Sequence, residues 1–354
     1  MEKLLKIGVI QAIVDSHLAW ADSPQMDAYE ANAIWRQIQA AFASFQEMSE
    51  TNKPDIVVIP ELAVATYFES RIKSYAQKIG AIVIAGLDFK QYENDKVANK
   101  AVFYVPRDWP HEKNVGKVKS TSFYFGKHFA SREEMRIINS KWKKNFSPCN
   151  EFYIVDLAGY GKLGVSICAD FYDIERYAIY KGRIQHLLII ANNKDVKSFY
   201  FLAETISRLV FCNVVICNSG HYGGSVCFTP AKHEFERYSY KHEGHDLFTT
   251  QIVSLPVDAL WKAQSENEDA LKEFKNPPPG YENRHCGDAA HSVPNRRNID
   301  DAPNVPNCVM KNVIFKFCAA GLLRQKGTIC LNSNLTPSCS SRAEIFPKMK
   351  FLIS

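Results

Sequence analysis

Short apolar runs alternate with amphipathic segments along most of the chain. The apolar runs predict strands at residues 5–11, 55–60, 81–86, 101–105, 152–156, 162–167, 186–191, 214–218, 225–228 and 247–255. Apolar residues at helical spacing predict helices at residues 31–48, 70–79, 174–181 and 199–211. Strands that alternate with helices and are apolar on both faces are typical of buried sheets, so the pattern predicts an α/β protein.

The alternation covers residues 1–275, which we interpret as one domain. After the run Pro277 to Pro279 the periodicity fades, apart from residues 313–323. Residues 276–354 are rich in Cys, Asn, Pro and Ser, and we expect an irregular C-terminal extension there. It could wrap a partner or be a segment foreign to the ancestral domain.

Composition limits the possible functions. The 354 residues are 46% hydrophobic, which excludes disorder of the whole chain. The net charge of +5 comes from 43 basic and 38 acidic residues without a sustained basic run, so nucleic acid is not an expected partner. The N-terminal apolar run is too short for a signal peptide, and no stretch approaches the roughly 20 apolar residues of a membrane span. We expect a soluble cytoplasmic protein, in which thiols such as Cys212 and Cys217 stay reduced.

Cys168 is the first candidate for chemistry. It comes directly after the predicted strand 162–167 and before a predicted helix, where backbone N–H groups and the helix dipole favour a thiolate. A sharp turn between strand and helix also projects a side chain into a cleft. A lone cysteine beside an apolar strand is nevertheless more often a structural thiol, so its position alone does not make it catalytic.

Two charged groups could assist a cysteine nucleophile. Glu61 directly follows the predicted strand 55–60, and the end of a buried strand is the usual place for active-site groups in α/β proteins. A carboxylate there could act as a general base. Lys127 offers a cation for an oxyanion, with Glu133 and Glu134 six and seven residues later. Taken alone, Glu61 could equally be a solvated loop glutamate or a helix-capping acid, and Lys127 is more often a surface charge.

Taken together, the segments around Glu61, Lys127 and Cys168 resemble the nitrilase (carbon–nitrogen hydrolase) superfamily. The matching segments follow one another in the same order as in that family and cover most of the chain. Residues 7–11 resemble that family's opening strand, residues 59–61 its first catalytic segment, and residues 161–170 its nucleophile segment, the most specific match. Residues 191–193 are similar to the segment after the next strand. Residues 217–230 resemble the closing strands.

The resemblance implies a Glu-Lys-Cys triad. Glu61 would take the proton of the thiol, and Cys168 would attack. Lys117, Lys119 and Lys127 all lie between these two residues, and the resemblance favours Lys127 with Lys119 as the alternative. It also implies a second glutamate, for which Glu134 is favoured over Glu133. Asn192 and Asn193 are the further candidates for substrate binding.

The resemblance further implies a four-layer α-β-β-α sandwich whose subunits pair into a homodimer or a larger homo-oligomer. The expected reaction forms a thioester acyl-enzyme from a small molecule with an amide, nitrile or carbamoyl carbon, and requires no metal or organic cofactor. Many relatives carry an aromatic residue after the nucleophile and then an Arg-Phe-Pro string. Residues 169–173 of this chain differ from that pattern, so the substrate cannot be transferred from the family.

Two alternative functions remain at this stage. A catalytically silent interaction or regulatory protein is compatible with the unusual segment around Lys127 and with the Cys-rich extension. A zinc-dependent amidohydrolase is disfavoured, because the ten histidines show neither HxH nor HExxH spacing.

Overall fold

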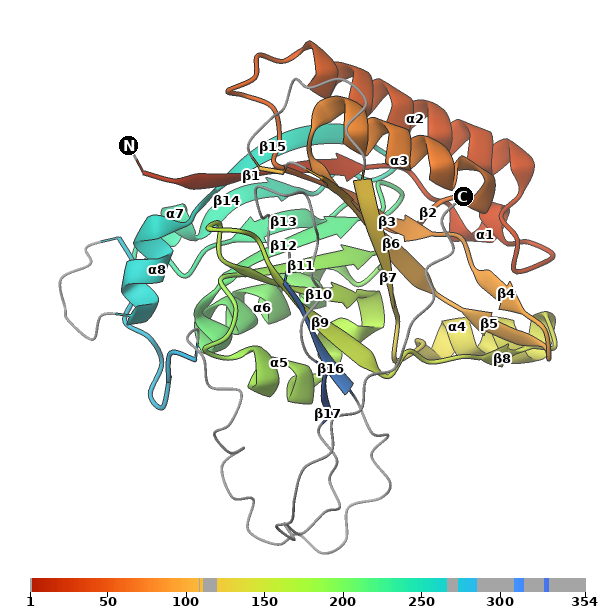
Figure 1. The fold of residues 1–354 in the computed structure, drawn as a ribbon. Helices are drawn as coiled ribbons and strands as arrows, with labels where there is room; N and C mark the ends of the chain where they lie inside the picture. Colours follow the sequence, from red (N-terminus) through yellow and green to blue (C-terminus); the bar gives the residue numbers. More distant parts are fainter. Residues whose placement is uncertain are drawn as a thin grey trace, which may run out of the picture.

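The fold is described from a computed structural model of the chain. It describes residues 2–107, 109–110, 120–265 and 273–284, together with the backbone of the two strands Val309–Ile314 and Thr328–Cys330. Two β-sheets lie face to face, and helices cover their outer surfaces (Figure 1).

The first sheet has six strands in the order β15-β1-β2-β3-β6-β7. The central strands β1, β2 and β3 are parallel, whereas β15, β6 and β7 pair antiparallel with their neighbours. The bounds are β1 Leu4–Gln11, β2 Ile56–Val64, β3 Ile82–Leu87, β6 Lys100–Pro106, β7 Ser120–Gly126 and β15 Thr249–Pro256.

The second sheet has eight strands in the order β14-β13-β12-β11-β10-β9-β16-β17. Its parallel centre consists of β10, β11 and β12. The bounds are β9 Glu151–Asp156, β10 Lys162–Ile167, β11 His186–Ala191, β12 Asn213–Asn218, β13 Ser225–Phe228, β14 Tyr238–His242, β16 Val309–Ile314 and β17 Thr328–Cys330.

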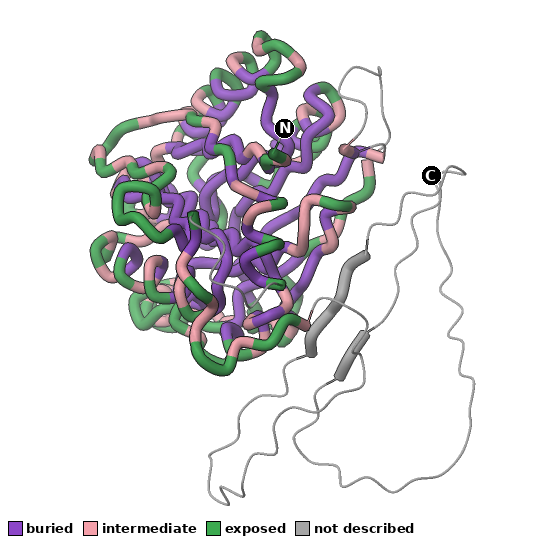
Figure 2. The backbone as a smooth tube through the Cα atoms, turned by 90° about the vertical axis from the view of Figure 1, so that its left-hand side faces the viewer, coloured by how far each residue is buried: buried purple, intermediate pink, exposed green. Residues whose placement is uncertain are grey.

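Alternation along β2 explains the layers. Ile56 and Val58 face the core shared with the second sheet, while Val57 and Ile59 face the helices α2 (Ala28–Glu47) and α3 (Glu69–Ile79). The helices α5 (Ile174–Tyr180) and α6 (Val196–Ile206) cover the outer face of the second sheet (Figure 1). The predicted α-β-β-α sandwich is therefore confirmed, and Figure 2 shows the buried residues concentrated in the interior of the molecule.

Smaller elements surround the sandwich. A three-stranded sheet in the order β4-β5-β8 lies beside α4. The bounds are α1 Ser16–Ala19, α4 Arg132–Arg136, α7 Glu234–Arg237, α8 Asp258–Ser265, β4 Lys90–Tyr92, β5 Lys96–Ala98 and β8 Asn145–Phe146. Short 3₁₀ turns occupy Thr66–Phe68 and Cys168–Tyr172, and π-helical turns occupy Ile137–Lys141 and Ser207–Phe211. None of the helices in the described ranges is long and apolar enough to cross a membrane.

The structure changes three expectations about these elements. Strand β2 does not end at Pro60 but continues to Val64, so Glu61 lies within it. The predicted helix 199–211 is α6 followed by the π-helical turn. Strands β7 and β14 were not predicted, because most of their residues are exposed or only partly buried and they form no buried apolar run.

The predicted extension at residues 276–354 lies largely outside the described residues. Within it, β16 pairs parallel with β9 and antiparallel with β17, so both strands belong to the second sheet. The division of the chain at residue 275 stays a prediction.

Candidate active site

Glu61 lies on an irregular part of β2. The pairing of β2 with β3 shifts between Ile59 and Val64, and Leu62 has a positive φ of 58°. Gly86 on β3 permits this path, because a Cβ atom there would lie 2.3 Å from the carbonyl oxygen of Pro60 and 2.5 Å from the Cα of Glu61. The glycine therefore lets the backbone that carries Glu61 approach β3 closely.

Cys168 is held at the first residue of a tight turn. It directly follows β10, opens the 3₁₀ turn Cys168–Tyr172 and has a φ of 45°, which a non-glycine residue rarely adopts. Its side chain is buried. Such strained conformations persist where the surrounding structure fixes them, and they cluster at functional sites. The structure thus places Cys168 between a strand and a helix, as its sequence position predicts.

Lys127 directly follows β7 and points into the protein. Its side chain is only 3% exposed, and its Nζ lies 2.8 Å from Glu61 Oε1 and 2.6 Å from Glu134 Oε2. Its backbone N–H donates to the carbonyl oxygen of Asn99 at 2.9 Å. The alternatives Lys117 and Lys119 lie outside the described residues.

Glu134, and not Glu133, contacts the lysine. Glu134 lies in α4, where it forms a reciprocal capping box with Ser131 that fixes the start of the helix. Glu133 on the same helix is exposed and pairs instead with Arg136. The helix cap therefore directs one glutamate of the adjacent pair toward Lys127.

Asn99 was not predicted from the sequence and contacts both glutamates. It lies between β5 and β6 and is 1% exposed. Its Nδ2 donates to Glu61 Oε1 at 2.7 Å and to Glu134 Oε1 at 3.2 Å. The only signal in the sequence is one amide among apolar residues, which does not indicate a partner.

The two asparagines after β11 have different neighbours. The backbone N–H of Asn192 donates to Glu61 Oε2 at 2.9 Å, and its Nδ2 donates to Ser16 Oγ at 2.9 Å. Asn193 bonds Asn218 and the backbone of Asp195. Asn192 therefore belongs to the group around Glu61, whereas the hydrogen bonds of Asn193 stabilise the turn next to Asn192.

Burial and charge set the protonation states at this site. Burial lowers the pKa of Lys127, but the charges of Glu134 and Glu61 outweigh it and hold that pKa well above its ordinary value, so the ammonium stays charged. Burial, followed by the charge of Glu61, raises the pKa of Cys168, while Lys127 and a hydrogen bond from the Asn192 N–H oppose the rise. The resting cysteine is therefore a neutral thiol that needs a base.

The chain is similar to known proteins in structure rather than in sequence. No protein-family model and no curated protein sequence matches it. Among solved structures, it is similar to a CN-hydrolase superfamily protein of Xanthomonas campestris that carries an arsenic adduct in its active site, with 13% identity and a TM-score of 0.52 over 74% of this chain and 94% of the other. Nit3 of Saccharomyces cerevisiae, a member of branch 10 of the nitrilase superfamily, gives 14% identity and a TM-score of 0.52 over the same shares. The chain has the nitrilase-superfamily fold.

Within this nitrilase-superfamily fold, Asp170 ties the cysteine segment to the lysine segment. Its fully buried carboxylate accepts the backbone N–H groups of His128 and Phe129, the shortest at 2.7 Å. Arg176 of α5 donates to the same carboxylate at 3.1 Å and to the carbonyl oxygen of Val165 at 3.3 Å. A buried charge pair thus links the turn after Cys168 to the residues that follow Lys127.

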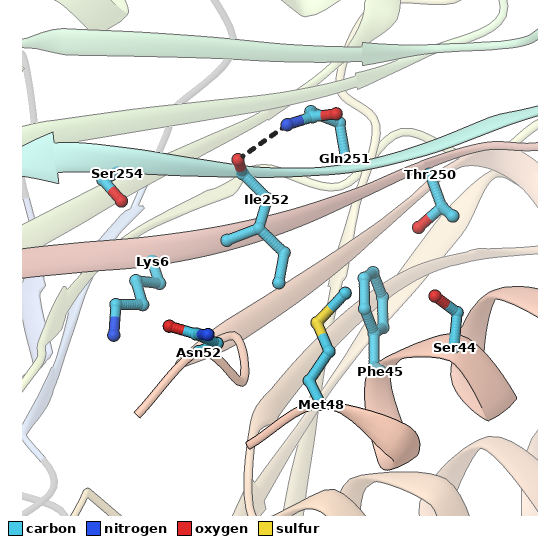
Figure 3. A pocket seen from close by; sticks show the side chains of 9 residues that line it. All are labelled: Lys6, Ser44, Phe45, Met48, Asn52, Thr250, Gln251, Ile252 and Ser254. Atoms are coloured by element: carbon cyan, nitrogen blue, oxygen red, sulfur yellow. Dashed lines mark hydrogen bonds between the residues drawn. The ribbon is translucent and has the colours of Figure 1, made fainter. Parts of the chain in front are cut away.

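A cavity elsewhere in the described structure is separate from this site. A cavity of about 360 Å³ lies between the end of α2 and β15, and Glu61, Lys127 and Cys168 do not line it (Figure 3). Its lining includes Lys6, Phe45 and Ile252. Within the described ranges, no group of three His, Cys, Asp or Glu side chains could hold a metal ion.

We predict that Asp170→Asn lowers the free energy of unfolding by about 3–5 kcal/mol, because it leaves the buried guanidinium of Arg176 with only the more distant carboxylate of Asp173, 3.6 Å from Nε. Urea denaturation measures this change. The matched control is Glu133→Gln, which removes an exposed ion pair on α4 and should leave the unfolding midpoint unchanged. Equal midpoints for the two variants would contradict a structural role of the Asp170 pair.

Proposed function

We propose that the chain is a cysteine hydrolase that cleaves a non-peptide carbon–nitrogen bond of an amide, nitrile or carbamoyl compound through Glu61, Lys127 and Cys168. One observation carries the proposal: a buried ammonium contacts two carboxylates, and the charges of this ammonium and of Glu61 act on the pKa of a buried cysteine in a strained turn. Buried charges are costly, so such an arrangement needs a reason beyond stability.

The geometry favours Glu61 Oε2 as the base. Oε1 already accepts from Lys127 and Asn99, whereas Oε2 accepts from the Asn192 N–H. The charge of Glu61 and the Asn192 N–H both act on the pKa of Cys168, so the glutamate and the sulfur lie near each other. In the proposed first step, Oε2 takes the thiol proton and the sulfur becomes a thiolate.

The thiolate then attacks the substrate carbon. The ammonium of Lys127 stabilises the negative charge that develops on the substrate, and it needs no reorganisation because two glutamates already hold it. With an amide, the C–N bond breaks as Glu61 gives its proton to the departing nitrogen, which leaves a thioester. Glu61 next takes a proton from water, the water oxygen attacks the thioester, and the carboxylic acid leaves as the Cys168 thiol is restored.

We propose that Glu134, Asn192 and Asn193 support substrate binding in different ways, with Asn192 as the residue that contacts the substrate. The Oδ1 of Asn192 is buried and accepts no hydrogen bond within the described structure, so it can accept an N–H of a small-molecule substrate. Glu134 acts through Lys127, and Asn193 shapes the turn that carries Asn192. The proposed chemistry requires no metal or organic cofactor.

We also propose that two copies of the chain pair through α5 and α6. These helices carry Ile174 and Phe201, which are 80% and 72% exposed. Pairing through this layer would bury both apolar side chains. The homodimer expected from the family resemblance would cover this layer.

The proposed compartment is the reducing cytoplasm. Cys212, Cys217 and Cys227 are buried free thiols in the second sheet or directly beside it. Burial raises the pKa of each of them and keeps each thiol in its unreactive neutral form.

For the interface, we predict that the unmodified protein is a dimer or larger by light scattering, and that the double substitution Ile174→Glu with Phe201→Glu shifts it to monomer. The control is Phe235→Glu on α7, where an equally exposed apolar residue lies outside the proposed interface. A monomer at all micromolar concentrations would contradict the proposed pairing.

The catalytic proposal is tested by alkylation with iodoacetamide across a pH series, read by peptide mass spectrometry. If Glu61 is the base, Cys168 reacts faster than Cys212 and Cys217, and Glu61→Gln slows its reaction by roughly 100-fold. An increase in the alkylation rate in Glu61→Gln would have a different meaning. The charge of Glu61 raises the pKa of Cys168, so Glu61→Gln would speed alkylation if Glu61 were only a neighbouring charge.

Two results would reject the catalytic proposal. One is faster alkylation of Cys168 in Glu61→Gln, and the other is equal labelling of Cys168 and the structural thiols in the unmodified protein. Either result would favour the catalytically silent interaction or regulatory protein.

A further inference from the structure

Asn99 is buried where an amide has no obvious structural purpose. It separates β5 from β6, its neighbours Val97, Ala98 and Ala101 are apolar and buried, and its own side chain is 1% exposed. Its backbone carbonyl accepts the N–H of Lys127, so the residue lies directly beside the lysine. A small apolar side chain would suit these surroundings better unless the amide has specific partners.

The amide closes a ring of four polar groups. Lys127 Nζ donates to Glu61 Oε1 and Glu134 Oε2, and Asn99 Nδ2 donates to the Oε1 atoms of the same two glutamates. The two hydrogens of Nδ2 are therefore divided between the two carboxylates. Asn99 is neutral, so it orients both carboxylates without adding charge to the buried site.

The orientation of the amide is determined by its partners. Within the described structure, Asn99 Oδ1 is buried and accepts no hydrogen bond. Turning the amide over would bring Oδ1 against two carboxylate oxygens, which are also acceptors, and would leave Nδ2 where Oδ1 now lies. The protein thus retains an unpaired carbonyl, which is costly, in order to present both N–H groups to the glutamates.

We propose that Asn99 is a positioning residue that binds Glu61 Oε1 and thereby leaves Oε2 as the oxygen that accepts the proton of Cys168. This inference rests on the proposed function. Asn99 acts through Glu61, and because it also binds Glu134, it couples the orientation of the two glutamates. It completes the ring around Lys127 but does not itself contact the reacting atoms.

The test compares Asn99→Ala and the isosteric Asn99→Asp with the unmodified protein, using the pH profile of iodoacetamide alkylation at Cys168. In Asn99→Ala, the Glu61 carboxylate loses one hydrogen-bond donor and becomes more basic. The rising limb of the alkylation rate against pH should therefore move to higher pH by about one unit. On the acid side of the limb, alkylation should fall roughly tenfold. Asn99→Asp should move the limb further, because it places an acceptor and a negative charge beside Glu61.

The matched control is Asn213→Ala. Asn213 is also fully buried, donates through Nδ2 to His186 and the carbonyl of Pro256, and has an unpaired Oδ1, but it does not contact the glutamates. We expect this substitution to lower the melting temperature, as we expect for Asn99→Ala, without moving the rising limb of the pH profile. The comparison separates positioning of the base from a general loss of stability.

The outcomes separate the two claims. Two results overturn the role of Asn99 and leave the proposed function intact. One is a pH profile in both Asn99 variants that equals the profile of the unmodified protein. The other is a shifted profile in Asn99→Ala together with an unshifted profile in Asn99→Asp. Absence of fast, Glu61-dependent alkylation in the unmodified protein overturns both claims. A shifted limb in the two Asn99 variants with an unshifted limb in Asn213→Ala supports the positioning role.

Discussion

The buried ammonium of Lys127 is the group on which the rest of the site depends. Removing a lysine charge from water costs several kcal/mol even after relaxation, and the cost is recovered only with well-placed opposite charge. Here two carboxylates lie within 2.8 Å of Nζ. Because two negative groups face one positive group, further donors are needed, and the amide of Asn99 and the backbone N–H of Asn192 supply them.

The two-sheet architecture brings these donors and acceptors together from distant parts of the chain. Glu61 lies in β2 of the first sheet. Asn192 follows β11 of the second sheet, and β11 packs against β2. Lys127 follows β7, and the Asp170–Arg176 pair connects its segment to the turn that holds Cys168. The strained φ of Cys168 is therefore supported from both sheets.

The sequence predicted the parts of this arrangement that depend on local pattern. The strands 162–167, 186–191 and 225–228 were predicted with the observed bounds, because each is a short and mainly apolar run. The exposed strands β7 and β14 lack such a run and were missed. The extension of β2 past Pro60 depends on the close approach allowed by Gly86, a contact between strands that no local pattern reveals.

The candidate site was only partly accessible to sequence analysis. Family resemblance pointed to Glu61, Lys127 and Cys168, and the structure brings Glu61 and Lys127 into direct contact, although their catalytic roles stay predictions. Asn99 could not be predicted, because its importance lies in two partners that are 38 and 35 residues away. The same holds for Asp170, whose role is visible only when the backbone N–H groups of residues 128 and 129 lie against it.

The central claim is that Cys168 becomes a covalent nucleophile within this buried charge network. The most direct measurement is mass spectrometry of the whole chain after brief exposure to the activated ester p-nitrophenyl acetate, followed by peptide mapping and a time course. The account predicts an acetyl thioester on Cys168 that disappears by hydrolysis and does not form in Cys168→Ala. Acetylation confined to other residues, or an acetyl group that persists on Cys168 without hydrolysis, would contradict it.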